Sequence, residues 1–492
     1  MSPLHTDTLD EHVARVPAPT YDRGRVRTGI VHIGVGGFHR AHQAVYLDEL
    51  MRRGQAMDWG ICGVGLLPGD RKMHQALEAQ DHLYTVVVKH ADGTREPRII
   101  GSIVQYLYAP DDPEAVVEKL ADPATGIVSL TITEGGYNID GATGRFDAGN
   151  AFVRADLEPD ALPTTVFGLV VEALARRRER GVPPFTVLSC DNLRANGDVA
   201  RRSFGVFAAL RDPELGEWVH REVSFPNSMV DRITPVTSDE DRADLARRHG
   251  VEDRWPVVCE PFTQWVVEDS FTAGRPPLQE VGVQLVDDVE PYELMKLRLL
   301  NASHQALCYL GYLAGYRFVH EVCRDPLFAS FLLRYMTREA VPTLPPVPGI
   351  DLDRYPRQLL ERFSNAEVSD TLARLCADTS DRIPVFLLPV VWENLASGGE
   401  VEHAAAVVAS WARYAEGTDE QGETIHVVDR LRELTMAAAR HWPEDPLAFL
   451  RQRELFDHLV DHPRFVAAYT AALTTLHTTG ARAVLEDLAA AA

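Results

Sequence analysis

The stretch Ile30-Val-His-Ile-Gly34-Val-Gly-Gly-Phe-His39-Arg-Ala-His42-Gln43 joins an apolar, β-branched run to a helical pattern that continues to about Arg53. A glycine-rich turn between a strand and a helix is the setting in which dinucleotides bind. Gly34 would make the tight turn, and Gly36 would let the backbone approach a pyrophosphate at the helix N-terminus. The alternative is a tight turn without a ligand, because His39 replaces the usual third glycine.

Apolar runs of strand length alternate with helical patterns in the first half of the chain, which is typical of a mostly parallel sheet covered by helices. The clearest of these runs are Gly29–Gly34, Trp59–Val64, Ile127–Thr133 and Phe185–Cys190, with Pro256–Glu260 and Val281–Val286 further on. Tyr84–Lys89 and Arg98–Gly101 flank a turn at Asp92-Gly93, which predicts an antiparallel hairpin inserted in the sheet domain.

The second half reads as mainly helical from Pro291 onward, with long amphipathic stretches such as Ala404–Tyr414 and Phe465–Thr479. The proline-rich segment Val341–Gly349 predicts a surface loop between helices. Because 492 residues exceed the size that a single core reaches, we expect two domains in an α/β protein. These are a Rossmann-type dinucleotide-binding domain with a hairpin insertion at 1–287 and a mainly helical substrate-binding domain at 288–492.

The chain is acidic, with 72 Asp and Glu against 49 Lys and Arg and a formal charge of −23. This charge opposes binding to nucleic acid or to an anionic membrane, and favours a small-molecule partner. The six cysteines occur singly, which indicates reduced core thiols. No apolar window is long enough to span a bilayer and no signal-like N-terminal segment occurs. We therefore expect a soluble, cytoplasmic protein.

Three side chains with chemical potential lie in an otherwise apolar helical pattern from Tyr292 to Tyr312: Lys296, Asn301 and His304. At about 100° per residue, all three project from one side of an α-helix. A neutral lysine can remove the O–H proton of an alcohol, and an amide can donate to the negative charge that develops on the oxygen. The alternatives are a solvated surface lysine, a core histidine and a capping asparagine.

Further candidates follow the ends of strands, where ligands bind in open α/β sheets. Glu134 and Asn192 come after the third and fourth runs, although a plain loop and an Asx turn are the alternatives. Asp70 is the first acidic residue after the second run. It would bind the ribose hydroxyls and select NAD over NADP, or only cap the helix beginning at Arg71.

His39 and His42 share a helix face, but no cysteine or acidic residue nearby completes a zinc site. We expect no metal here, and assign these histidines to packing, capping or phosphate contact.

Several motifs together resemble the polyol-specific long-chain dehydrogenases over nearly the whole chain. They are Gly34-Val-Gly-Gly-Phe-His-Arg-Ala-His42, Thr131-Ile-Thr-Glu-Gly-Gly136, Ser189-Cys-Asp-Asn192, Phe225-Pro-Asn-Ser-Met-Val-Asp-Arg-Ile-Thr-Pro235 and the Lys296, Asn301 and His304 segment. The resemblance implies a zinc-independent NAD enzyme with an N-terminal Rossmann-type domain, a helical C-terminal domain and an active site in the cleft between them.

The resemblance also implies residue roles. Lys296 matches the general acid/base, and Asn192 and Asn301 match the asparagines that hold the reacting oxygen. His304 would orient the substrate, and Glu134 would assist proton exchange with solvent. Asp231 and Arg374 would contact the polyol hydroxyls. The cofactor would be bound by Gly34, Gly36, Gly37, Phe38, His39, Arg40 and Asp70.

The favoured reaction is the reversible oxidation of a polyol to a ketose, D-mannitol to D-fructose, with D-arabinitol as a second substrate. A hexuronate reductase acting on fructuronate or tagaturonate is the nearest alternative. A non-catalytic NAD(H) sensor would keep the glycine turn but would not need Lys296, Asn301 and His304 together. Members of the resembled family are commonly monomers, so a monomer is expected, with a homo-oligomer left open.

Overall fold

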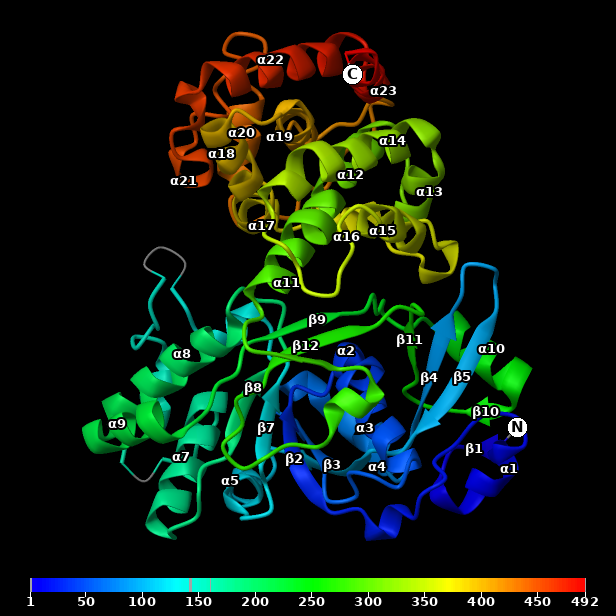
Figure 1. Cartoon of the computed structure of the whole chain (residues 1–492), viewed down its shortest axis with the longest axis vertical. Helices are drawn as coiled ribbons and strands as arrows, with labels where there is room; N and C mark the ends of the chain where they lie inside the picture. Colours follow the sequence, from blue (N-terminus) through cyan, green and yellow to red (C-terminus); the bar gives the residue numbers. More distant parts are fainter. Residues whose placement is uncertain (1, 141–143, 160, 492) are drawn as a thin grey trace. The chain divides into compact units, whose positions relative to one another are not determined.

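The computed structural model describes residues 2–140, 144–159 and 161–491, which form two compact units, Met1–Val289 and Glu290–Ala492 (Figure 1). The units divide between residues 289 and 290, where the sequence predicted a boundary between 287 and 288.

The first unit is built on a five-stranded parallel sheet of order β6-β3-β2-β7-β8. Its strands are β2 (Thr28–Ile33), β3 (Gly60–Gly65), β6 (Ile103–Tyr108), β7 (Ile127–Leu130) and β8 (Thr186–Ser189). Strand β2 lies in the middle of this order, paired with β3 on one side and with β7 on the other. The predicted parallel sheet is confirmed, with β6 as an additional strand.

Alternate residues of a strand point to opposite faces of the sheet, and here helices cover the apolar side chains on both faces. Val31, Ile33 and Val128 pack into a core with α5 (Pro113–Ala121), α7 (Val166–Glu179) and α8 (Asn196–Arg211). Ile30 and Ile127 pack into a second core with α3 (Gln43–Arg52). Burial on both faces explains why these strands read as continuous apolar runs rather than as alternating ones.

The predicted hairpin is confirmed: β4 (Tyr84–Lys89) and β5 (Arg95–Ile100) are antiparallel, and β11 (Val257–Cys259) extends them into a three-stranded sheet. A third sheet has the order β13-β12-β9, from β9 (Ser228–Asp231), β12 (Gln264–Glu268) and β13 (Gln284–Val286). Strands β9 and β12 were not predicted from the sequence. The remaining elements of this unit are β1 (Ser2–Pro3), β10 (Val251–Glu252), α1 (Leu9–Val13), α2 (Gly37–Ala41), α4 (Arg71–Glu78), α6 (Ala151–Asp156), α9 (Pro213–Glu222) and α10 (Asp239–His249).

The second unit is helical, as predicted, and its central helix is α12 (Ala302–Leu313). Every residue of α12 except Tyr312 is buried, which is the pattern of a helix surrounded by other helices. Helices α19 (Glu402–Ala415) and α22 (Pro463–Thr478) pack against each other and match the two long amphipathic stretches. The others are α11 (Glu290–Met295), α13 (Val319–Arg324), α14 (Pro326–Arg334), α15 (Tyr355–Phe363), α16 (Leu372–Cys376), α17 (Thr379–Phe386), α18 (Leu388–Ser397), α20 (Arg432–Ala439), α21 (Arg453–Phe456) and α23 (Ala481–Ala490).

All six cysteines are free, buried thiols, three in each unit. Within the described ranges, no helix is both long and apolar enough to cross a membrane.

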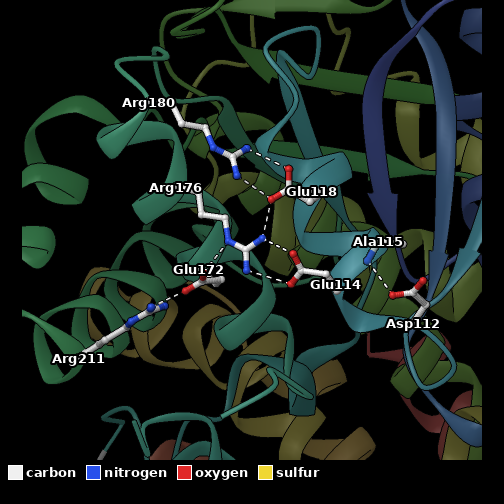
Figure 2. A network of polar contacts seen from close by, with 8 residues as sticks. All are labelled: Asp112, Glu114, Ala115, Glu118, Glu172, Arg176, Arg180 and Arg211. Atoms are coloured by element: carbon white, nitrogen blue, oxygen red, sulfur yellow. Dashed lines mark hydrogen bonds and ion pairs between the residues drawn. The ribbon is translucent and has the colours of Figure 1, made fainter. Parts of the chain in front are cut away.

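An ion-pair cluster centred on Arg176 joins α5, α7 and α8 at the surface (Figure 2). Arg176 bonds to Glu114 at 2.5 Å, to Glu118 at 2.5 Å and to Glu172 at 2.7 Å. Arg180 binds Glu118 as well, and Arg211 binds Glu172. Hydrogen bonds from Arg180 and then from Arg176 lower the pKa of Glu118 to about 2.

Arg176→Met keeps the apolar part of the side chain and removes the charge that three carboxylates share. We expect a loss of about 1 kcal/mol in the free energy of unfolding at low salt, because exposed pairs are individually weak. The loss should nearly disappear in 1 M salt, where the screening length falls to about 3 Å. Denaturant titrations at both salt concentrations measure it, with Arg180→Met as a control that loses only Glu118.

The contribution of Glu118 also fixes a pH dependence. Its pKa is lower in the folded protein than its ordinary 4.5, so its stabilising effect is complete above that value and is lost as the pH falls toward 2. The difference between wild type and Arg176→Met should therefore shrink as the pH is lowered below 4.5. If the difference in the free energy of unfolding persists at low pH and in high salt, it arises from the packing of Arg176 and not from its ion pairs.

Candidate functional site

The glycine turn lies at the carboxyl end of β2, where the chain passes close to β7. Gly34 has a φ of +94°, and a Cβ there would lie 2.1 Å from the carbonyl oxygen of Thr131. Only glycine fits both constraints. A Cβ on Gly36 would meet nothing nearer than the Gly34 carbonyl oxygen at 3.9 Å. The backbone at Gly36 is thus open to a ligand, at the switch point where open α/β sheets bind dinucleotides.

Helix α2 begins directly after this turn, so its first N–H groups have no acceptor within the helix and can bind an anion. The side chain of His39 is turned into the protein, where it stacks on His32 of β2 with ring centroids 3.4 Å apart. Burial lowers the pKa of His32 to about 3 and that of His39 well below its usual value. Two neutral rings therefore make the strand-to-helix contact that a third glycine makes in the usual fingerprint.

Arg40 is buried as well, with Nη1 donating to the carbonyl of Trp255 and the guanidinium 5.2 Å from the ring centroid of Tyr84. Contact of the His39 and Arg40 side chains with a phosphate, one role expected from the sequence, does not fit this burial. Packing, another of the roles expected for His39, does fit it. Gly36, Gly37 and Phe38 are only partly buried, and contact of their backbone with a pyrophosphate stays a prediction.

The single helix predicted up to Arg53 is wrong, because the backbone breaks at His42 between α2 and α3. His42 accepts a hydrogen bond from Gln43 Nε2 at 2.9 Å and bonds through its other nitrogen to the Gln264 carbonyl at 2.8 Å. It thus connects the turn to β12. Throughout the described residues, no three His, Cys, Asp or Glu side chains are grouped to hold a metal ion.

Asp70 follows β3, and its Oδ2 accepts from the backbone N–H groups of Leu66 at 3.0 Å and Leu67 at 2.9 Å. Asp70 is the N-cap residue of α4 but makes no side-chain hydrogen bond to that helix, and its carboxylate instead closes the turn that leads into it. Both bonds use the same oxygen, so the other oxygen can accept from a ribose hydroxyl. Arg71, the nearest cation along the chain, is paired in a bidentate manner with Asp111.

Glu134 and Asn192 follow β7 and β8 at the same edge of the sheet, and both are exposed. Asp231 ends β9 and is only 4% exposed, and the Arg232 that follows donates to the carbonyls of Glu260 and Ala41. Both residues are buried, so they do not form a solvated surface ion pair.

The segment with Lys296 is not the continuous α-helix that the sequence predicted. Lys296–Asn301 form a π-helix between α11 and α12. A π-helix turns less per residue, so the projection angles calculated for an α-helix do not apply. Short π-helical segments in longer helices are found frequently at functional sites.

The three side chains of this segment are largely withdrawn from solvent. Lys296 is 9% and His304 8% exposed, which excludes a solvated surface lysine. His304 packs on the Phe363 ring at a centroid distance of 4.5 Å. Among the described residues, the buried Oδ1 of Asn301 has no hydrogen-bond partner. It is one of several such atoms among the described residues, and a polar ligand atom can supply its missing partner.

Two residues that sequence reasoning missed hold the π-helix in place. The guanidinium of Arg298 binds Glu393 at 2.6 and 3.0 Å. The buried hydroxyl of Tyr335 donates to the Arg298 carbonyl at 3.2 Å. A basic residue within an apolar helical pattern is the only sequence signal of this anchor.

Arg374 makes a bidentate pair with Asp370 at 2.6 and 2.7 Å, and its side chain is 57% exposed. Burial of Asp370 opposes its ionisation, but the hydrogen bonds from Arg374 outweigh it and the pKa is lowered, with a smaller contribution from the charge of His304. Arg374 and His304 thus share one electrostatic neighbourhood within the second unit. Contact of Arg374 with substrate stays a prediction.

A parallel sheet with an open glycine turn at its switch point, together with a buried lysine and imidazole and a partly buried amide in the helical unit, defines a dinucleotide-dependent dehydrogenase. Residues 28–280 match the model of the mannitol dehydrogenase Rossmann domain, and residues 288–477 match that of the mannitol dehydrogenase C-terminal domain. The chain therefore belongs to the mannitol dehydrogenase family, and the family and fold class predicted from the sequence are confirmed.

Named relatives match over nearly their whole length. The mannitol 2-dehydrogenase of Aspergillus fumigatus is 48% identical over 474 residues, which are 95% of this chain and 94% of that protein. The solved ternary complex of Pseudomonas fluorescens mannitol 2-dehydrogenase with NAD and D-mannitol is 47% identical, with a TM-score of 0.89 over 99% of this chain and 100% of the other. A substrate-free D-sorbitol dehydrogenase is 40% identical, with a TM-score of 0.90 over 98% of this chain and 100% of the other.

Asp70→Asn keeps an oxygen for the Leu66 and Leu67 N–H groups and removes the negative charge. If Asp70 selects against the 2′-phosphate, the ratio of kcat/KM with NADP to that with NAD should rise about tenfold, the effect of about 1.4 kcal/mol. Steady-state kinetics with both cofactors measure this ratio. Asp92→Asn, in the exposed hairpin turn, is the control. An unchanged ratio would remove Asp70 from cofactor selection.

Proposed function

We propose that this chain catalyses the reversible, NAD-dependent oxidation of D-mannitol to D-fructose. The observation that carries the proposal is its full-length likeness, at 47% identity, to a mannitol 2-dehydrogenase solved with NAD and D-mannitol. The likeness to a D-sorbitol dehydrogenase at 40% identity makes D-sorbitol the second candidate substrate. D-Arabinitol and the hexuronates, the alternatives from the sequence, are tested beside it.

Lys296 acts as the base in this proposal. Oxidation of a secondary alcohol removes the O–H proton while a hydride leaves the same carbon, so the oxygen gains negative charge. The amine of Lys296 takes the proton in oxidation and returns it in reduction. NAD, when bound at the glycine turn, accepts the hydride.

The two asparagines hold the reacting oxygen. The side-chain amides of Asn192 and Asn301 donate to the charge that develops there without carrying a charge themselves. The buried amide oxygen of Asn301, which has no partner among the described residues, supports a contact with substrate, since a neighbouring hydroxyl can donate to it while Nδ2 donates to the reacting oxygen. Non-additive losses of kcat/KM in the double-mutant cycle Asn192→Ala and Asn301→Ala would show that they act on one group.

The other residues orient the substrate and connect the base to water. His304 hydrogen-bonds a substrate hydroxyl, and Asp231 and Arg374 bind further hydroxyls of the polyol. Glu134 is exposed, which suits the exchange of the proton of Lys296 with solvent. The protein would act on a small molecule without a metal ion. Its monomeric state and cytoplasmic location stay predictions.

Absorbance of NADH tests the proposal with D-mannitol, D-sorbitol, D-arabinitol, D-fructose and fructuronate. We expect the highest kcat/KM among the polyols for D-mannitol, and dialysis against a chelator should leave the rate unchanged. If kcat/KM is higher for D-sorbitol or fructuronate than for D-mannitol, that compound is the substrate instead. If chelation abolishes the activity and added zinc restores it, the lysine mechanism is wrong and the reaction depends on zinc.

Lys296→Ala should lower kcat by about 100-fold or more, the usual contribution of a positioned acid/base. NADH should bind as in wild type, because the glycine turn belongs to the other unit. In wild type, oxidation should need the neutral amine and rise with pH, whereas reduction should need the protonated amine and fall with pH. A single group should govern both profiles.

Stopped-flow kinetics measures the rates and their pH profiles, and titration with NADH measures cofactor binding. Lys119→Ala on α5 is the control. An added primary amine should restore part of the rate of Lys296→Ala by entering the vacated space. Near-normal turnover with an unchanged pH profile would make His304 the next candidate for the base.

A further inference from the structure

Three segments that carry proposed site residues are joined by one buried polar network in the first unit. They are the turn after β7 with Glu134, the turn after β8 with Asn192, and β9, which ends at Asp231. Asp191, immediately before Asn192, lies at the centre of the network and is 6% exposed. None of the proposed roles assigned above uses this carboxylate.

Asp191 accepts three hydrogen bonds from the turn after β7. The backbone N–H of Ile132 donates at 3.1 Å, that of Thr133 at 2.8 Å and the Tyr137 hydroxyl at 2.7 Å. Tyr137 is completely buried. Both ends of the Thr133 to Tyr137 segment are thus bonded to one side chain, and Glu134 lies between them.

The turn needs such a restraint, because Thr133 has a φ of +66° and a ψ of 168°. This region is populated almost only by glycine, and a β-branched residue enters it at a cost that the surroundings must offset. The bond from Thr133 N–H to Asp191 Oδ1 is a direct restraint on this strained residue. Backbone strain of this kind concentrates at functional sites.

The turn after β8 is connected to β9 through Asn196, whose side chain is fully buried. Asn196 Nδ2 donates to the carbonyls of Asp191 at 3.0 Å and Ser228 at 2.8 Å, and its Oδ1 accepts from Ser228 N–H at 2.9 Å. The backbone of Asp191 is therefore fixed while its carboxylate holds the neighbouring turn.

We propose that Asp191 is a positioning residue that holds Thr133 in its strained conformation and so places Glu134 and Asn192 for catalysis. The inference rests on the proposed roles of Glu134 and Asn192. It assigns Asp191 no contact with substrate or cofactor.

Asp191→Asn tests the proposal with little change in shape. Thr133 N–H and Ile132 N–H bond to different oxygens of Asp191, and an amide has only one oxygen, so one of the two N–H groups would face an NH₂ group instead. We expect kcat for D-mannitol oxidation to fall by tenfold or more and its pH profile to shift, since Glu134 would no longer be placed for proton exchange. The Kd of NADH should stay within twofold of wild type.

Asp253→Asn is a matched control. Asp253 is also a buried carboxylate, and it accepts from the backbone N–H groups of Thr85 and Trp255 and from Gln80. Its loss should lower the Tm comparably while leaving the pH profile of kcat unchanged. If Asp191→Asn also lowers only the Tm, the positioning role is overturned.

Thr133→Gly provides a rescue, because glycine adopts the required backbone conformation without strain. In the Asp191→Asn background it should recover several-fold of the lost kcat, and a loss of kcat without recovery would overturn the proposal. If Asp191→Asn does not fold, Tyr137→Phe removes a single bond to Asp191, and a smaller shift in the same direction is expected. An unchanged kcat and pH profile in Tyr137→Phe would then overturn it.

Glu134→Gln and Asn192→Ala separate this inference from the proposed function. If both keep wild-type kcat, the proposed roles fail and the inference fails with them. If both lose kcat while Asp191→Asn keeps it, only the positioning role is wrong.

Discussion

The approach of Gly34 to the Thr131 carbonyl is the constraint on which the rest of the first unit depends. It brings the carboxyl ends of β2 and β7 so close that no side chain fits at residue 34. The Thr131 hydroxyl adds a hydrogen bond to the Gly34 carbonyl at 2.7 Å, and His32 bonds to the same hydroxyl at 3.0 Å. Beyond this contact, the chain after β2 continues to the open backbone at Gly36, and the chain after β7 continues to the strained turn at Thr133. The glycine turn and the turn that carries Glu134 are thus fixed relative to each other by this contact and by the hydrogen bonds of the Thr131 hydroxyl.

The second unit fixes its chemical groups differently. Lys296 and Asn301 lie in a π-helix that a side chain from another helical segment, Tyr335, anchors from within the core. Arg298 adds a charged anchor to Glu393. In both units, buried polar contacts set the conformation of the segments that carry the site residues, whereas apolar packing forms the scaffold around them. Buried polar groups specify one arrangement because a group whose partner moves away stays buried without a hydrogen bond, which costs free energy.

The sequence predicted the parts of this structure that local pattern determines. Strands β2, β3, β7 and β8 are apolar on both faces, and the Asp92-Gly93 turn marks the hairpin. Strands β9 and β12 could not be recognised, since each is a short run with only two or three apolar residues between polar ones. The break at His42 depends on a bond to Gln264, more than 200 residues away, and the π-helix depends on Tyr335. Asp191 was visible only as part of a family motif, because its partners lie about 60 residues earlier.

The distribution of the thiols has a practical consequence. Burial raises the pKa of Cys62 to about 12, so this thiol is almost entirely protonated near neutral pH and is a poor nucleophile. Three buried thiols lie in each unit, so an alkylating reagent reaches each of them only when the surrounding segment opens. Each alkylated cysteine then reports a local opening that exposed its thiol to solvent. Peptide-level mapping of the modified cysteines would then give separate opening rates for the sheet unit and the helical unit.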